Sequence, residues 1–178
     1  MTGRKILVAV DLQNDFIDGA LGTKEAQAIV PAAAVRIREM REAGADVFAT
    51  LDTHDDNYMQ TQEGRKLPVP HCIRNTGGWQ LNPMIREALG EFTAVEKPTF
   101  GSTRLPEMIR ERVMPEEKVT IELLGLCTDI CVVSNALLLK AAFPEAEIQV
   151  NSACCAGVTP EKHQAALETM ASSQIDIL

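Results

Sequence analysis

The chain has 178 residues, of which 46% are hydrophobic and 24% charged, and its formal net charge is −8. This composition is typical of a globular protein, and its length predicts one domain over residues 1–178. An acidic chain lacks the basic face of a nucleic-acid binder, so we expect no nucleic-acid partner. We also expect no membrane partner and no signal peptide, because no apolar run reaches membrane-spanning length. Five cysteines suggest no disulfide framework, which predicts a cytoplasmic location.

Short apolar runs alternate along the chain with segments of helical periodicity. In chain order, the expected elements are strand 6–10, helix 31–44, strand 46–51, helix 82–89, strand 92–96, helix 105–113, strand 119–124, the helix after Thr128, strand 147–150, helix 159–171 and a last strand 175–178. Residues 55–76 show neither the helical nor the alternating hydrophobic periodicity, which indicates a functional loop. The alternation predicts an α/β fold, a three-layer α/β/α sandwich with a central, mainly parallel sheet of Rossmann-like topology.

Three chemically useful side chains follow strands of this sheet: Asp11, Lys97 and Cys131. With Thr128 as N-cap, Cys131 lies in the first helical turn, where the backbone N–H groups favour the thiolate. A carboxylate that takes the thiol proton and an ammonium that stabilises anions complete a nucleophilic site. The backbone N–H groups of Cys127 and Cys131 could stabilise an oxyanion. Taken singly, Cys131 is also explained as a small buried hydrophobe and Asp11 as a turn residue.

A second set of polar side chains lies near the long loop. Asp52 and His54 follow the second strand, and His71 comes seventeen residues after His54. Two imidazoles and a carboxylate suit Zn²⁺, Mn²⁺ or Fe²⁺ and leave positions open for water or substrate. Glu63 offers a further oxygen. His163, on the last helix, has no such neighbours in sequence, and we expect it to be solvated or a simple core contact.

Several motifs together resemble the isochorismatase-like cysteine hydrolase family, and within it the nicotinamidase/pyrazinamidase subgroup. The resemblance extends over nearly the whole chain. Its motifs are Asp11-Leu-Gln-Asn-Asp-Phe16, Asp52-Thr-His54, Pro70-His71-Cys72, Asn75-Thr76, Gly78, Lys97 and Gly125-Leu-Cys-Thr-Asp-Ile-Cys131.

The resemblance implies a catalytic triad. Cys131 would be the nucleophile, Asp11 the general base and then the acid, and Lys97 an electrostatic partner. It also implies a cis peptide between Leu126 and Cys127, which directs backbone N–H groups into the oxyanion hole.

The resemblance further implies that Asp52, His54 and His71 bind a divalent metal, with zinc as the expected ion. In the nicotinamidase subgroup the metal holds the pyridine nitrogen, so that the carboxamide carbon faces the thiolate. The expected reaction is therefore hydrolysis of nicotinamide to nicotinate and ammonia through a thioester. Family members are commonly homo-oligomers, so the same is expected here.

The chain departs from the nicotinamidase pattern at the substrate ring. Nicotinamidases often carry a tryptophan shortly before the second metal histidine, and residues 66–71 contain no aromatic side chain. Phe16 is the expected ring partner, with Tyr58, Trp79 and Phe100 as further aromatics. Another small amide or a carbamoyl compound is the alternative substrate. Isochorismate is not expected, because true isochorismatases lack both the nucleophilic cysteine and the metal set.

Two functions of other classes are also considered. A dinucleotide-binding module needs G-x-G-x-x-G after the first strand, where this chain has Asp11-Leu-Gln-Asn-Asp. A thiol-redox protein would use Cys127 and Cys131, whose three-residue separation differs from the usual C-x-x-C. Both classes fit the sequence less well than a hydrolase does.

Overall fold

The computed structural model describes residues 3–178, and its strands form one six-stranded sheet in the order β3-β2-β1-β4-β5-β6. All five strand pairings are parallel. The strands are β1 (Arg4–Val10), β2 (Asp46–Asp52), β3 (Thr93–Lys97), β4 (Val119–Leu126), β5 (Glu147–Ala156) and β6 (Asp176–Ile177). This order reverses at β1 and β4, as in Rossmann-like folds, so the expected fold class is confirmed.

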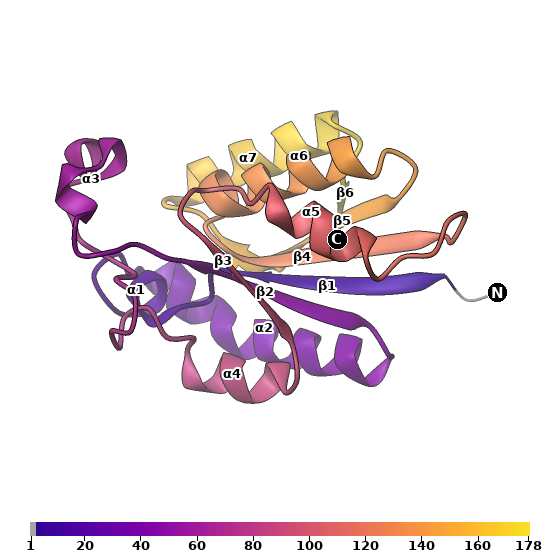
Figure 1. The fold of residues 1–178 in the computed structure, drawn as a ribbon, viewed down its shortest axis with the longest axis horizontal. Helices are drawn as coiled ribbons and strands as arrows, with labels where there is room; N and C mark the ends of the chain where they lie inside the picture. Colours follow the sequence, from indigo (N-terminus) through magenta and orange to yellow (C-terminus); the bar gives the residue numbers. More distant parts are fainter. Residues whose placement is uncertain (1–2) are drawn as a thin grey trace.

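Helices cover both faces of the sheet, with α2 and α4 on one side and α5, α6 and α7 on the other (Figure 1). The helices are α1 (Asn14–Ile17), α2 (Lys24–Glu42), η1 (Tyr58–Gln60), α3 (Gln62–Lys66), α4 (Pro83–Leu89), α5 (Arg104–Arg110), η2 (Thr128–Val132), α6 (Val133–Ala142) and α7 (Pro160–Ser172). No helix within residues 3–178 is both long and apolar enough to cross a membrane.

The two central strands are in close contact at their carboxyl ends, where the site forms. Residues 6–10 of β1 are buried because helices cover both faces of the sheet. Val10 pairs with Thr50 on one side and with Gly125 on the other. Gly125 has φ +126°, and a Cβ there would lie 2.1 Å from the Val10 carbonyl oxygen. Only glycine therefore allows β4 to lead into residues 127–131 beside Asp11.

Helix α2 differs most from its expected bounds. It begins at Lys24 rather than at Pro31, because the Thr23 hydroxyl accepts a hydrogen bond from the Ala26 backbone N–H at 3.0 Å and caps the helix. Pro31 lies inside the helix on its exposed side. Proline is common at the first helical position, but here the Thr23 cap, eight residues upstream of Pro31, determines the start of the helix.

Three further segments depart from expectation. Residues 55–76 are not wholly irregular, since they contain η1 and α3. β5 extends to Ala156 and includes residues expected to form a loop. Thr128 is not an N-cap: residues Thr128–Val132 form a π-helical turn, and Cys127 precedes it without a side-chain cap. Cys131 therefore lies in a π-helical turn rather than in the first turn of a regular α-helix.

Candidate active site

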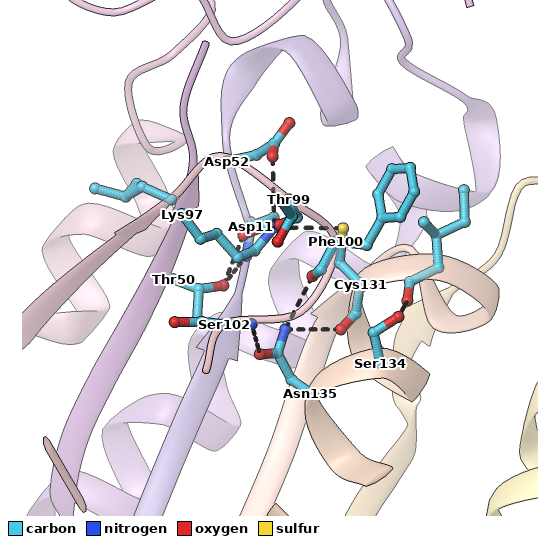
Figure 2. A network of polar contacts seen from close by, with 12 residues as sticks. Asp11, Thr50, Asp52, Lys97, Thr99, Phe100, Ser102, Cys131, Ser134 and Asn135 are labelled. Carbon is cyan, nitrogen blue, oxygen red and sulfur yellow. Dashed lines mark hydrogen bonds and ion pairs between the residues drawn. The ribbon is translucent and has the colours of Figure 1, made fainter. Parts of the chain in front are cut away.

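The structure brings Asp11, Lys97 and Cys131 together at the carboxyl edge of the sheet (Figure 2). Lys97 Nζ lies 2.6 Å from Asp11 Oδ2 and 3.5 Å from Cys131 Sγ. All three side chains are at least 96% buried. Each residue follows or ends a different strand, so the parallel sheet itself sets their separation. A thiol, a carboxylate and an ammonium in contact can move a proton away from sulfur.

Thr50 orients the Asp11 carboxylate. Its hydroxyl donates to Asp11 Oδ1 at 2.6 Å, and the Asp11 backbone has φ +47°, an uncommon value for a residue other than glycine. Asp11 Oδ2 forms the ion pair with Lys97 and accepts no other hydrogen bond within the described chain. This oxygen can therefore accept a proton from Cys131.

Burial and neighbouring charges set the protonation of these groups. Burial raises the pKa of the Cys131 thiol well above its usual range, and the Asp11 charge adds to this. Burial also raises the pKa of Asp11, against the lowering effect of Lys97. Burial alone would lower the pKa of Lys97, but the charge of Asp11 raises it above the ordinary lysine range. Burial thus opposes the thiolate that a position near a helix start favours, and the Asp11 carboxylate is available to take the thiol proton.

Asp52, His54 and His71 converge beside the Cys131 site. Asp52 Oδ2 lies 3.0 Å from His54 Nε2 and 3.3 Å from His71 Nε2, and the three potential ligand atoms lie within 4.8 Å of one another. His71 Nδ1 is 2.8 Å from the Val69 carbonyl oxygen, which holds the proton on Nδ1 and frees Nε2 for a metal. The donor set therefore fits a divalent cation.

Asp52 connects the metal set with the triad. Its Oδ1 accepts from Lys97 Nζ at 3.5 Å, while Oδ2 faces the two imidazoles. Burial alone would raise the pKa of Asp52, but the adjacent His54 and His71 rings and the Lys97 charge hold it well below the usual range. Glu63 Oε1 lies 3.7 Å from both Nε2 atoms, so it offers a further oxygen beside the three clustered ligand atoms.

A pocket of about 220 Å³ opens onto both sets. Cys127 and Cys131 line it, and the peptide between Leu126 and Cys127 is cis, as the resemblance implies. Apolar side chains form most of the remaining lining, and they include Phe16, Leu21, Leu67, Phe100, Ile130 and Val158. The pocket thus places a thiol and a potential metal site at the base of an apolar cavity.

Two aromatic residues line this pocket, Phe16 and Phe100. The Phe16 ring packs edge-on against His71 with centroids 5.5 Å apart. Tyr58 is buried behind the two imidazoles, and its hydroxyl donates to the Leu67 carbonyl. Trp79 donates from its indole to the Thr53 hydroxyl at 2.9 Å and does not line the pocket. Of the four aromatics considered as ring partners, two are therefore placed to contact a ligand.

His163 has a partner that its place in the sequence did not reveal. Its Nδ1 is hydrogen-bonded to Thr128 Oγ1 at 2.7 Å, and the residue is half-buried rather than a simple core contact. Beside it, Asp129 Oδ1 accepts from the Val158 backbone N–H at 2.9 Å. These contacts fasten the π-helical turn to α7 and to the segment after β5.

Sequence reasoning missed two buried residues that hold the site. Thr50 orients Asp11, and the signal for it was a polar residue near the end of a buried strand. The Gln13 side chain accepts from the Asp52 backbone N–H at 2.8 Å and donates to the carbonyl oxygens of Asp52 and Trp79. Gln13 lies within a motif already singled out, but its partners are distant in sequence.

Comparison with known proteins gives a consistent result. A sequence model of the isochorismatase domain matches residues 5–178. An uncharacterized isochorismatase family protein, PncA of Bacillus subtilis, is 31% identical over 182 residues, covering 96% of each chain. The nicotinamidase/pyrazinamidase of Mycobacterium tuberculosis is 26% identical, covering 98% of each chain. The crystal structure of the Pyrococcus horikoshii pyrazinamidase in complex with zinc superposes with a TM-score of 0.81 at 27% identity, covering 98% of each chain. The chain therefore belongs to the isochorismatase family.

Proposed function

We propose that this protein is a metal-assisted cysteine amidase that hydrolyses nicotinamide to nicotinate and ammonia through a thioester. The observation that carries the proposal is the contact of Lys97 Nζ with both Asp11 and Cys131 beside an apolar pocket. The relatives named as nicotinamidase or pyrazinamidase support the choice of substrate.

The reaction would begin with proton transfer from the Cys131 thiol to Asp11. The sulfur then attacks the carboxamide carbon, and the backbone N–H groups of Cys127 and Cys131 stabilise the oxyanion. Asp11 returns the proton to the leaving nitrogen, so ammonia departs and a thioester remains. Asp11 next takes a proton from water, and the hydroxide attacks the thioester carbon. The C–S bond then breaks, Asp11 returns its proton to the Cys131 sulfur, and the product leaves as nicotinate after losing its own proton to solvent. Lys97 stays cationic throughout and stabilises each anion.

We assign the metal site to Asp52, His54 and His71, with zinc as the proposed ion. Two imidazole nitrogens and a carboxylate suit zinc and leave a position open for a ligand. When bound, the metal would supply a Lewis-acid contact for the pyridine nitrogen and orient the ring. Glu63 Oε1, at 3.7 Å from both Nε2 atoms, could supply a further oxygen to this ion.

The pocket lining favours a neutral, flat substrate. Phe16 and Phe100 offer ring faces and edges, and no lysine or arginine is among the lining residues. A carbamoyl compound that bears a carboxylate would find no cationic partner on the pocket wall. Nicotinamide is neutral and apolar over most of its surface, so we prefer it.

Ammonia release across a panel of amides tests the proposal. The panel should hold nicotinamide, pyrazinamide, aliphatic amides and carbamoyl compounds, each assayed with and without added zinc. We expect the highest kcat/KM for the two ring amides. Preference for an aliphatic amide or a carbamoyl compound would overturn the assigned substrate while leaving a cysteine hydrolase in place.

A thiol-redox role is disfavoured by the state of the cysteines. All five are free, and burial raises the pKa of Cys127 to about 12, which leaves it a poor redox thiol. Free thiols suit a reducing compartment, and on this ground we propose a cytoplasmic location. Assembly into a homo-oligomer stays a prediction, which light scattering of the purified protein tests.

A further inference from the structure

The buried side chain of Asn135 connects the nucleophile to the turn of residues 98–102. Asn135 lies on α6, four residues after Cys131, and is fully buried. Its Nδ2 donates to the carbonyl oxygens of Cys131 at 2.8 Å and Phe100 at 3.2 Å. Its Oδ1 accepts from the Ser102 backbone N–H at 2.9 Å (Figure 2). One side-chain amide therefore connects the Cys131 carbonyl with two backbone groups of the turn, the Phe100 carbonyl and the Ser102 N–H.

The turn is fixed from other directions as well. Lys97 Nζ donates to the Thr99 carbonyl oxygen at 3.0 Å. At Gly101 the chain runs against α6 so closely that a Cβ would lie 2.8 Å from a Leu138 methyl and 3.2 Å from Ser134 Cβ. The backbone of this turn is thus held by the buried polar groups of the site on one side and by α6 on the other.

The position of the Phe100 ring is set mainly by the backbone of this turn. Its side chain is 46% exposed, although it lines the pocket beside Cys131 and Ile130. A core ring is positioned by the atoms packed around it, whereas an exposed ring takes its place mainly from its backbone. The position of the ring relative to the Cys131 sulfur therefore depends on two hydrogen bonds, one that Asn135 donates to the Phe100 carbonyl and one that it accepts from the Ser102 N–H.

We propose that Asn135 is a positioning residue that holds the Phe100 ring at the distance from Cys131 required by planar aromatic amides. The proposal rests on the proposed function for its substrate. An asparagine suits this role because one amide supplies both donors and an acceptor. Threonine or serine can bond back to the Cys131 carbonyl within the helix but offers no second donor and acceptor for the turn.

The test compares Asn135→Thr with Ser134→Ala. Ser134 is the neighbouring residue, and its hydroxyl donates to the Ile130 carbonyl at 2.6 Å without bonding to the turn. We expect Asn135→Thr to raise KM for nicotinamide about threefold to tenfold, the value of one aromatic contact, with kcat near wild type. Ser134→Ala should leave both constants unchanged. For an aliphatic amide, Asn135→Thr should change KM little.

A double-mutant cycle shows whether Asn135 acts through Phe100. If it does, Asn135→Thr adds nothing to the KM of Phe100→Ala. Three results would each overturn the proposal: KM effects of the two substitutions that multiply in the double mutant, an unchanged KM in Asn135→Thr, or a loss in Asn135→Thr confined to kcat. If circular dichroism shows that Asn135→Thr folds poorly, Asn135→Ser replaces it. Asn135→Ser removes the same two contacts with the turn, and the same results are expected of it.

Hydrogen exchange at the Ser102 amide separates this inference from the proposed function. Because that amide donates to Asn135 Oδ1, it should exchange faster in Asn135→Thr and at the wild-type rate in Ser134→Ala. Unchanged exchange at Ser102 in Asn135→Thr overturns the inference whatever the substrate is. If wild type does not hydrolyse nicotinamide, the proposed function is wrong, and the Ser102 result decides the inference alone.

Discussion

Two regions of the candidate active site differ in how firmly they are held. The buried polar cluster (Asp11, Asp52, Lys97 and Cys131) is at most 4% exposed, and strand ends and mutual ion pairs fix its members. The apolar rim (Leu67, Phe100 and Val158) is 38–46% exposed and lies on turns and loops. We infer that the cluster sets the rate of the chemical step, whereas the rim sets which amide is bound. Changes in the cluster should then lower kcat, and changes in the pocket wall should mainly alter KM.

Replacing the nucleophile should have the largest effect. Cys131→Ala removes the sulfur and little packing volume, so we expect a loss of about 10⁴-fold or more in kcat with the fold retained. Ammonia release measures the activity, and circular dichroism measures the fold. Cys155→Ala is the matched control, since Cys155 is also buried but lies outside the pocket. Residual turnover within tenfold of wild type would exclude Cys131 as the nucleophile.

Asp11→Asn should lower kcat by about 10²–10⁴-fold, the range of general acid–base catalysis, because an amide cannot take the thiol proton. Wild-type activity should fall as the pH drops through the Asp11 pKa, since only the carboxylate is a base. Burial raises that pKa, so the acid limb of the pH profile should lie above the ordinary aspartate range. Exposed Asp18→Asn should match wild type. An acid limb unchanged in Asp11→Asn would assign the base to another group.

Loss of a metal-ligand histidine should have an intermediate effect, seen as weaker substrate binding. His54→Ala and His71→Ala should each lose bound metal and raise KM for nicotinamide by about tenfold or more, at 1.4 kcal/mol per decade. Elemental analysis of protein purified without chelators measures the metal. His163→Gln should keep the metal, because His163 bonds to Thr128 instead. Wild-type protein with no stoichiometric metal would contradict the site.

The smallest effects should come from the pocket wall. Phe16→Ala should raise KM for nicotinamide by more than about threefold to tenfold, through lost burial as well as lost ring contact. Leu67→Trp should lower KM, because residue 67 lines the pocket and a ring there restores an aromatic partner. Pro68 is not among the lining residues, so Pro68→Trp is the matched control. Equal kinetics in Phe16→Ala and wild type would show that the substrate is not ring-shaped.

The same contrast explains how much could be predicted from the sequence. The polar cluster could be located because parallel strands end at one edge, and that rule places Asp11, Lys97 and Cys131 together without any alignment. The shift in the Cys131 pKa could not be predicted, since it depends on burial and on the neighbouring Asp11 charge. Local helix rules placed the cap at Thr128, whose hydroxyl bonds instead to His163, 35 residues away.

Residues that support the site were harder to predict than residues that form it. Thr50 bonds to Asp11 and Gln13 bonds to Asp52, each 39 residues away, and Asn135 bonds to Ser102, 33 residues away. None of these three pairs follows a local period. The predicted start of α2 was wrong because residues of both types occur at helix starts, and it is the Thr23 hydroxyl that caps this helix. The sequence likewise could not predict which of the four candidate aromatic rings line the pocket.

Partitioning by hydroxylamine tests the central claim, a thioester on Cys131, most directly. Wild-type enzyme turning over nicotinamide would be supplied with increasing hydroxylamine, and nicotinate and nicotinohydroxamic acid would be separated by chromatography. A thioester intermediate predicts hydroxamic acid formed at the expense of nicotinate, with both products absent in Cys131→Ala. Nicotinate formed without any hydroxamic acid, at a rate that hydroxylamine does not change, would contradict an acyl-enzyme and with it the role of Cys131.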